Sequence, residues 1–178
     1  QTVAVTTPPL PSITGFSVNP PSCFGLSNGT VAVNYTSGTA PYTVAWSNPI
    51  SQTINTPLLT HSVSGIASGL YSVTLTDFYG CTTSQPVNVT QPNVLVLIPS
   101  PNVTICYGQS TQISASGTGG TPGYTYSWTP NTITGGGPIT VTPTVTSSYN
   151  VFVTDANGCT TSPKIITVAV TPQLLING

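Results

Sequence analysis

The chain has 178 residues, of which 2% are charged, and its formal net charge at pH 7 is −1. Globular proteins ordinarily have about 25% charged residues, so this surface is polar but nearly uncharged. Without a basic patch the chain is not expected to bind nucleic acid or an anionic membrane. No apolar run approaches the ~18 residues that span a bilayer, so no membrane insertion is predicted.

Hydrophobic residues nevertheless make up 38% of the chain, and many of them alternate with polar residues. Such alternation is typical of strands with one buried face, so we predict an all-β protein rather than a disordered one. In the first half, strands are predicted at 13–18, 30–35 and 41–46, twice within 48–65, through Tyr71, and up to 87–90. In the second half they are predicted at 94–98, 112–116, 122–128 and 139–142, through Tyr149, and at 166–172.

One stretch occurs twice, which indicates a domain repeat. Residues 69–84 return as 148–162 with the shared pattern Tyr-x-Val-x-(Leu/Val)-Thr-Asp-x-x-Gly-Cys-Thr-Thr-Ser. The Asp-x-x-Gly segment predicts a turn, because the Asp side chain accepts backbone N–H bonds and Gly tolerates a positive φ. The predicted turn residues are Asp77 with Gly80 and Asp155 with Gly158.

Each half also has a tryptophan on a predicted strand, at a similar distance after its first cysteine. About seven short strands with such a tryptophan indicate an immunoglobulin-like β-sandwich, and we therefore predict two in tandem. The predicted core aromatics are Trp46, Tyr71, Trp128 and Tyr149. The alternative, that the two tryptophans are exposed platforms for stacking sugars, stays open. The second cysteine departs from antibody domains, since it lies beyond the hairpin turn.

Four motifs of the first half resemble the SprB-type repeat found in giant surface adhesins of gliding Bacteroidetes. They are Cys-x-Gly at 23–25, Asn-Gly-Thr at 28–30, Pro-Tyr-x-x-x-Trp at 41–46 and the Tyr-to-Cys block at 69–81. The second half, 106–172, lacks the Asn-Gly-Thr and is similar to polycystic-kidney-disease-like repeats. The resemblance implies a place at the bacterial cell surface, type IX secretion, gliding motility, and a role in adhesion or as a stalk.

The four cysteines suit an oxidising compartment. We predict one internal disulfide in each unit, Cys23 with Cys81 and Cys106 with Cys159. In the chain-entropy model such a bond is worth about 4 kcal/mol. A zinc site would need ligands at short spacing, and the chain has no Cys-x-x-Cys.

Residues with other chemistry are scarce, so we predict no enzyme, no catalytic residue, no cofactor and no metal. A calcium ion usually binds several carboxylates, whereas each unit has a single Asp. We therefore interpret Asp77 and Asp155 as turn residues and not as calcium ligands. His61 is the only histidine, and nothing completes a catalytic triad around it. The sequons at Asn28, Asn34, Asn88 and Asn102 are attributed to the Asn- and Thr-rich composition.

The predicted organisation extends beyond two complete units. Residues 1–9 look like the closing strand of a preceding repeat, 10–92 form repeat 1, 93–172 form repeat 2, and 173–178 open a following repeat. Because the chain begins with Gln1, we interpret it as a processed form or an excerpt. The end segments are expected to pair with domains outside the two units.

The leading hypothesis is a structural or adhesive segment of an extracellular repeat array, partnered by neighbouring repeats of the same chain or by adjacent filament subunits. Surface polysaccharide is a further candidate partner. One alternative is a carbohydrate-binding accessory module of a secreted enzyme, and another is a self-assembling filament subunit that uses strand donation. Aromatic residues in an exposed groove would favour the carbohydrate hypothesis, and burial of both tryptophans would favour the stalk.

Overall fold

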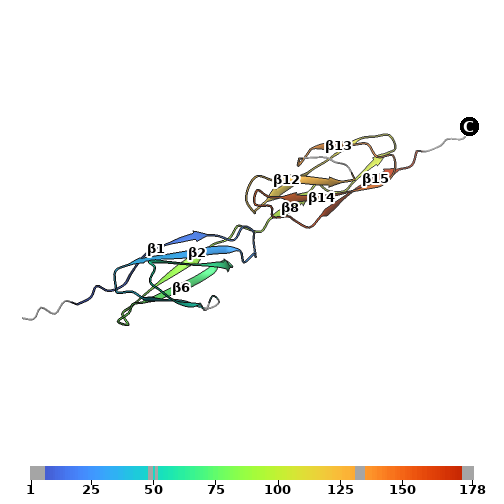
Figure 1. The fold of residues 1–178 in the computed structure, drawn as a ribbon. Coiled ribbons are helices and arrows are strands. Elements are labelled where there is room, and N and C mark those ends of the chain that lie inside the picture. Colours follow the sequence, from blue (N-terminus) through green and yellow to red (C-terminus); the bar gives the residue numbers. More distant parts are fainter. Residues whose placement is uncertain (1–6, 48–49, 51, 131–134, 174–178) are drawn as a thin grey trace, which may run out of the picture. The chain divides into compact units, whose positions relative to one another are not determined.

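A computed structural model describes residues 7–47, 50, 52–130 and 135–173. The chain divides into two compact units, Gln1–Gln91 and Pro92–Gly178, and every regular element in the described part is a β-strand (Figure 1). The chain is thus all-β and consists of tandem immunoglobulin-like sandwiches. The pairing predicted for the two end segments falls largely on 1–6 and 174–178, which lie outside the described residues.

The described residues of unit 1 form seven strands in two sheets, close to the predicted positions. The strands are β1 (Ser12–Asn19), β2 (Gly29–Thr36), β3 (Tyr42–Trp46), β4 (Thr53–Thr56), β5 (Thr60–Ile66), β6 (Gly69–Thr76) and β7 (Thr82–Val89). One sheet has the order β1-β2-β5 and the other β4-β3-β6-β7. All pairings within these two sheets are antiparallel.

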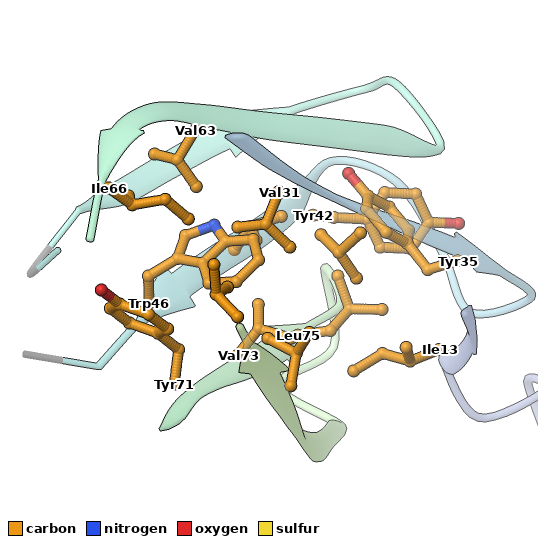
Figure 2. Close-up of a cluster of buried hydrophobic side chains, with 14 residues drawn as sticks. Ile13, Val31, Tyr35, Tyr42, Trp46, Val63, Ile66, Tyr71, Val73 and Leu75 are labelled. Carbon is orange, nitrogen blue, oxygen red and sulfur yellow. The ribbon is translucent and has the colours of Figure 1, made fainter. Parts of the chain in front are cut away.

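The core of unit 1 lies between its two sheets. In β2 the alternating residues Val31 and Val33 are fully buried, while Val44 and Leu75 are buried opposite each other on β3 and β6. All four belong to one cluster of buried side chains, in which Figure 2 shows Val31, Leu75 and the indole of Trp46. The two-residue period of the sequence therefore determines which face of each strand is buried.

Unit 2 repeats the sandwich with more irregular strands. They are β8 (Val96–Pro99), β9 (Val103–Cys106), β10 (Thr111–Ile113), β11 (Ala115–Thr118), β12 (Thr125–Thr129), β13 (Ile139–Val141), β14 (Ser147–Thr154) and β15 (Lys164–Thr171). The larger sheet has the order β12-β14-β15-β9. The strand pairs β8–β11 and β10–β13 form two further sheets of two strands each. Its core includes Trp128, Val151, Val153, Ile166 and Val168.

One strand of unit 2 was not predicted from the sequence. β9 pairs in parallel with β15, the last strand of the unit, so that Val103 lies opposite Val168. The signal for β9 is the alternation of Val103 and Ile105 after a proline. A short segment of this kind becomes a strand only through its distant partner, which explains why local periodicity missed it.

Candidate functional site: the two ends of each sandwich

The described residues contain no group of three or more His, Cys, Asp or Glu side chains that could hold a metal ion. Within those residues there is also no helix with the length and hydrophobicity to cross a membrane. The residues with distinctive chemistry, the cysteines and the two aspartates, lie instead in the loops and strand ends at the two ends of each sandwich. These ends form the candidate functional site.

Asp77 is a buried carboxylate that organises the loop between β6 and β7. Its Oδ1 accepts hydrogen bonds from the backbone N–H groups of Tyr79 at 3.0 Å and Cys81 at 2.9 Å. Its Oδ2 accepts a third from Thr39, in the loop between β2 and β3, at 3.3 Å. Gly80 completes the turn with φ of 83°, a value that L side chains rarely adopt. The turn thereby fixes the position of Cys81.

Asp155 builds the same turn in unit 2. Its Oδ1 accepts the N–H groups of Asn157 and Cys159, both at 2.9 Å, and its Oδ2 accepts that of Thr121 at 2.8 Å. Gly158 has φ of 80°. Burial by itself would raise the pKa of the Asp155 carboxyl, but the three N–H donors favour the ionised form and the pKa is lowered. Each Asp is thus a structural anchor for the cysteine four residues later.

The first cysteine of each unit lies where the chain leaves that unit, which we call the exit end. Beside Cys23, the backbone N–H of Gly25 donates to Oε1 of Gln91, the last residue of unit 1, at 2.8 Å. Cys106 lies opposite Thr171, the last residue of β15, in the parallel β9–β15 ladder. Cys23 and Cys106 are therefore the exit cysteines.

The second cysteine of each unit lies where the chain enters it, which we call the entrance end. The loop bonded to Asp77 lies against Pro11, just before β1, since a Cβ placed on Gly38 would come within 3.1 Å of the Pro11 side chain. In unit 2, Gly120 in the corresponding loop donates its N–H to the carbonyl of Asn93 at 2.9 Å. The entrance cysteines, Cys81 and Cys159, follow the two Asp turns.

The predicted internal disulfides, Cys23 with Cys81 and Cys106 with Cys159, are wrong. Cys23 and Cys159 are disulfide-bonded, whereas Cys81 and Cys106 are free thiols. Neither predicted pair therefore forms, because each contains one free cysteine.

The two cysteines of one unit cannot bond to each other because they lie at opposite ends of a strand. Eight residues of β7 separate Cys81 from the exit end of unit 1, and eight residues of β15 separate Cys159 from the exit end of unit 2. Eight strand residues span about 26 Å, whereas the Cα atoms of a disulfide lie about 4.4–6.8 Å apart. Spacing along the sequence does not reveal at which end of a sandwich a cysteine lies.

The structure places the four aromatic residues singled out from the sequence inside the sandwiches. Trp46 is 4% exposed and Trp128 3% exposed, and Tyr71 and Tyr149 are also buried. The hydroxyl of Tyr71 donates to the carbonyl oxygen of Ala67 at 2.9 Å. That bond corresponds to the tyrosine corner of immunoglobulin-like domains. Neither indole is available on the surface for stacking sugars.

The two indoles differ in hydrogen bonding. Nε1 of Trp128 donates to the carbonyl oxygen of Gly135 at 3.0 Å. Nε1 of Trp46 is buried and has no hydrogen-bond partner within the described part of the chain. Trp46 and Tyr71 belong to the same cluster of buried hydrophobic residues (Figure 2).

His61 lies on β5. Its Nε2 is buried and unpaired with respect to the described residues, and burial lowers the pKa of its imidazole. An open depression of about 610 Å³ lies at the ends of nearby strands, lined by Ser27, Gln52, Ser64, Tyr71 and neighbouring residues. None of the described lining residues is a carboxylate or a histidine, so the depression offers no acid–base pair.

Exposed aromatic side chains flank three of the cysteines, a feature that sequence reasoning missed. Phe24 is 55% exposed and Tyr107 50% exposed, each directly after an exit cysteine. Phe78 and Tyr79 are both 62% exposed in the turn before Cys81, and their rings meet edge to face at a centroid distance of 5.2 Å. The sequence does contain a signal for this feature, because an aromatic residue follows the first cysteine of each unit, in Cys-Phe-Gly and in Cys-Tyr-Gly.

Comparison with known protein families finds a match within the first unit. Residues 15–49 match the SprB repeat family, which confirms the predicted resemblance. None of the curated proteins compared with the chain matches it in sequence.

The chain is also similar to several solved structures. The three N-terminal domains of the bacteriophage RB49 highly immunogenic outer capsid protein (Hoc) are 14% identical with a TM-score of 0.52, over 91% of this chain and 59% of that one. Fibronectin(III)-like modules of Clostridium thermocellum CbhA are 14% identical with a TM-score of 0.39, over 89% and 95%. Dpr2 Ig1-Ig2, from its complex with DIP-Theta Ig1-Ig3, is 13% identical with a TM-score of 0.38, over 90% and 66%.

Proposed function

Because its first unit carries a SprB repeat, we propose that the chain is a structural and adhesive segment of an extracellular repeat array. Such an array would form the stalk or fibre of a bacterial cell-surface adhesin, exported by the type IX route and serving gliding motility. The observation that carries the proposal is the SprB match within the first of two similar sandwiches. Disulfide-bonded cysteines suit an oxidising compartment outside the cytosol.

The chemistry of the described surface supports a mechanical rather than a catalytic role. Both aspartates are engaged as turn anchors, and the single histidine lacks a partner acid. General acid–base catalysis needs positioned groups with matched pKa values, and the chain has only one Lys and two Asp as charged residues. We therefore propose that the chain is not an enzyme and works through neighbouring repeats.

Surface polysaccharide is a second partner that we propose for such an array. Because both tryptophans are buried, their indoles cannot stack on its sugar rings. A sugar-stacking contact in unit 1 would have to use exposed rings such as Phe78 and Tyr79. A glycan-binding assay with the F78A/Y79A variant tests this point. Equal binding by the variant and the original chain would assign any affinity to another surface.

The proposed function is tested by immuno-electron microscopy on cells that produce the protein. An antibody raised against the 178-residue chain should label filaments outside intact cells, with no increase after permeabilisation. An isotype-matched antibody and cells from which the gene has been deleted are the controls. Label that appears only inside permeabilised cells would refute a surface array.

A further inference from the structure

His61 lies on the inner face of β5, the face that covers the core of unit 1. β5 pairs with β2 so that His61 is opposite Val33, a fully buried core residue. The next residue on the same face is Val63, which is buried, whereas Ser62 between them is exposed. Because alternate residues of a strand share one face, the half-buried imidazole of His61 belongs to the row of side chains that packs on the core.

The buried nitrogen of this imidazole has no group to bond. Nε2 has no hydrogen-bond partner among the described residues, and burial lowers the pKa of the ring. In the protonated form both ring nitrogens are donors, so a proton taken up by His61 leaves a buried, positively charged N–H without an acceptor. Such a group costs free energy until it reaches water or a partner.

The neighbouring strands carry nothing that compensates this charge. Besides His61, the titratable side chains on the strands of unit 1 are all tyrosines, namely Tyr35 on β2, Tyr42 on β3 and Tyr71 on β6. Tyr35 lies diagonally across from His61 on the same face, but its hydroxyl is also buried without a partner, and burial raises its pKa. Asp77 is the only charged side chain of unit 1, and its carboxylate already binds three backbone N–H groups at the entrance end.

β5 is also held on one side only. The order of its sheet is β1-β2-β5, so β5 is an edge strand that bonds to β2 alone. The ladder between them is interrupted at Gly65, a bulged residue with φ of 73°. Segments with few ladder bonds open at a lower free energy than the rest of a fold. Detachment of β5 is therefore the least costly way to bring a protonated imidazole into water.

We propose that β5 is an acid-sensitive edge strand: proton uptake by His61 detaches it from β2 and uncovers the core of unit 1, while unit 2 stays closed. His61 is the only histidine of the chain, so unit 2 has no equivalent group. The acid response is thus confined to one of two similar sandwiches.

The pKa of His61 sets the direction and the range of this response. The detached imidazole binds a proton more tightly than the packed one, whose pKa is lowered. The free energy that holds β5 in place is therefore complete above the ordinary histidine pKa of about 6.5 and falls as the pH drops through the folded pKa. Carboxylates titrate near or below pH ~4, so the two acid responses occupy different ranges.

Hydrogen exchange at pH 7 and pH 5 tests the proposal on the whole chain. Peptides are compared by mass spectrometry after correction for the intrinsic exchange rate at each pH. The open fraction of the β5 peptide, 60–66, should rise several-fold, with an upper limit of about 25-fold for an imidazole that binds protons only when detached. Peptides from β6 in unit 1 and from β14 in unit 2 should keep their protection.

Two variants connect the response to the inward-facing imidazole. H61F keeps a ring at this position and removes the titrating group, so its β5 should be equally protected at both pH values. H61F/S62H is the matched control, because it returns an imidazole to the same strand on the exposed face, and it should behave like H61F. A rise in H61F as large as that in the original chain would overturn the proposal.

NMR titration of the unsubstituted chain provides a measurement that needs no variant. A single histidine gives one set of imidazole signals, and their midpoint in the folded protein should lie below about 6.5. A midpoint at or above that value would overturn the proposal. So would a loss of protection at pH 5 that is equal in all strands of unit 1 or that extends to unit 2. Neither measurement depends on the proposed repeat array.

Discussion

The carboxylate of Asp155 accepts a hydrogen bond from the backbone N–H of Thr121 at 2.8 Å, across two loops that are far apart in the sequence. Asp77 and Thr39 have the same relationship in unit 1, with a longer distance of 3.3 Å. A single carboxylate therefore both closes its own hairpin turn and ties that turn to a neighbouring loop. Such charge-assisted bonds are roughly twice as strong as neutral ones.

Acid should destabilise unit 2 through this carboxylate. The pKa of Asp155 is lowered in the folded state, so the unfolded state binds more protons and the free energy of unfolding falls as the pH drops. The contribution is fully present above the unfolded pKa of about 3.9 and is lost as the pH falls through the folded pKa. Urea unfolding at a series of pH values from neutral downward measures it.

The D155N variant is the matched test of that acid dependence. At pH 7 it should lose about 1–3 kcal/mol of unfolding free energy, the usual range for a hydrogen-bonded charged group. Its unfolding free energy should also vary less between neutral and acidic pH than that of the original chain. An unchanged acid slope in D155N would assign the slope to another group.

Replacing each tryptophan by phenylalanine should have unequal effects. Trp128 donates to the Gly135 carbonyl, whereas the Trp46 N–H has no partner among the described residues. W128F should therefore cost about 0.5–1.5 kcal/mol more than W46F. Denaturant unfolding followed by circular dichroism compares them, and equal losses would mean that the hydrogen bond is not stabilising.

The tyrosine corner should be worth a measurable share of the stability of unit 1. Y71F keeps the buried ring and removes the hydroxyl that donates to the Ala67 carbonyl, so a loss of about 0.5–1.5 kcal/mol is expected. Y107F is the control, because Tyr107 is half exposed and surface changes usually stay within about ±0.5 kcal/mol. Similar melting temperatures for Y71F and the control would contradict the assignment.

Unit 1 has a strained residue, Ser37, at a position where unit 2 has a glycine. Ser37 has φ of 60°, and the carbonyl of this residue accepts the Tyr42 hydroxyl at 2.8 Å. In unit 2 the position is Gly119, with φ of 73°, and its carbonyl accepts the Tyr124 hydroxyl. A left-handed conformation costs an L-residue about 1–2 kcal/mol, and glycine loses part of that gain in chain entropy.

S37G should therefore raise the free energy of unfolding, by up to about 1 kcal/mol. S37A is the control, since it removes the hydroxyl and keeps the Cβ that causes the strain. Thermal unfolding of the three proteins measures the difference. A stabilisation by S37A equal to that of S37G would show that the side-chain oxygen, and not the backbone, was unfavourable.

Most of the fold could be predicted from local pattern, because burial follows the period of each strand. The predicted strand at 41–46 corresponds to β3, Tyr42–Trp46, and the strand through Tyr71 to β6, Gly69–Thr76. The features that could not be predicted correctly depend on long-range geometry. The parallel pairing of β9 with β15 leaves almost no local trace, and the pairing of the cysteines depends on which end of a sandwich each one occupies.

The parallel pairing of β9 with β15 has a mechanical consequence for unit 2. β9 lies near the start of this unit and β15 at its end, so a force that draws the two strands apart along their length shears the ladder between them. The hydrogen bonds of that ladder then bear the load together instead of opening one after another.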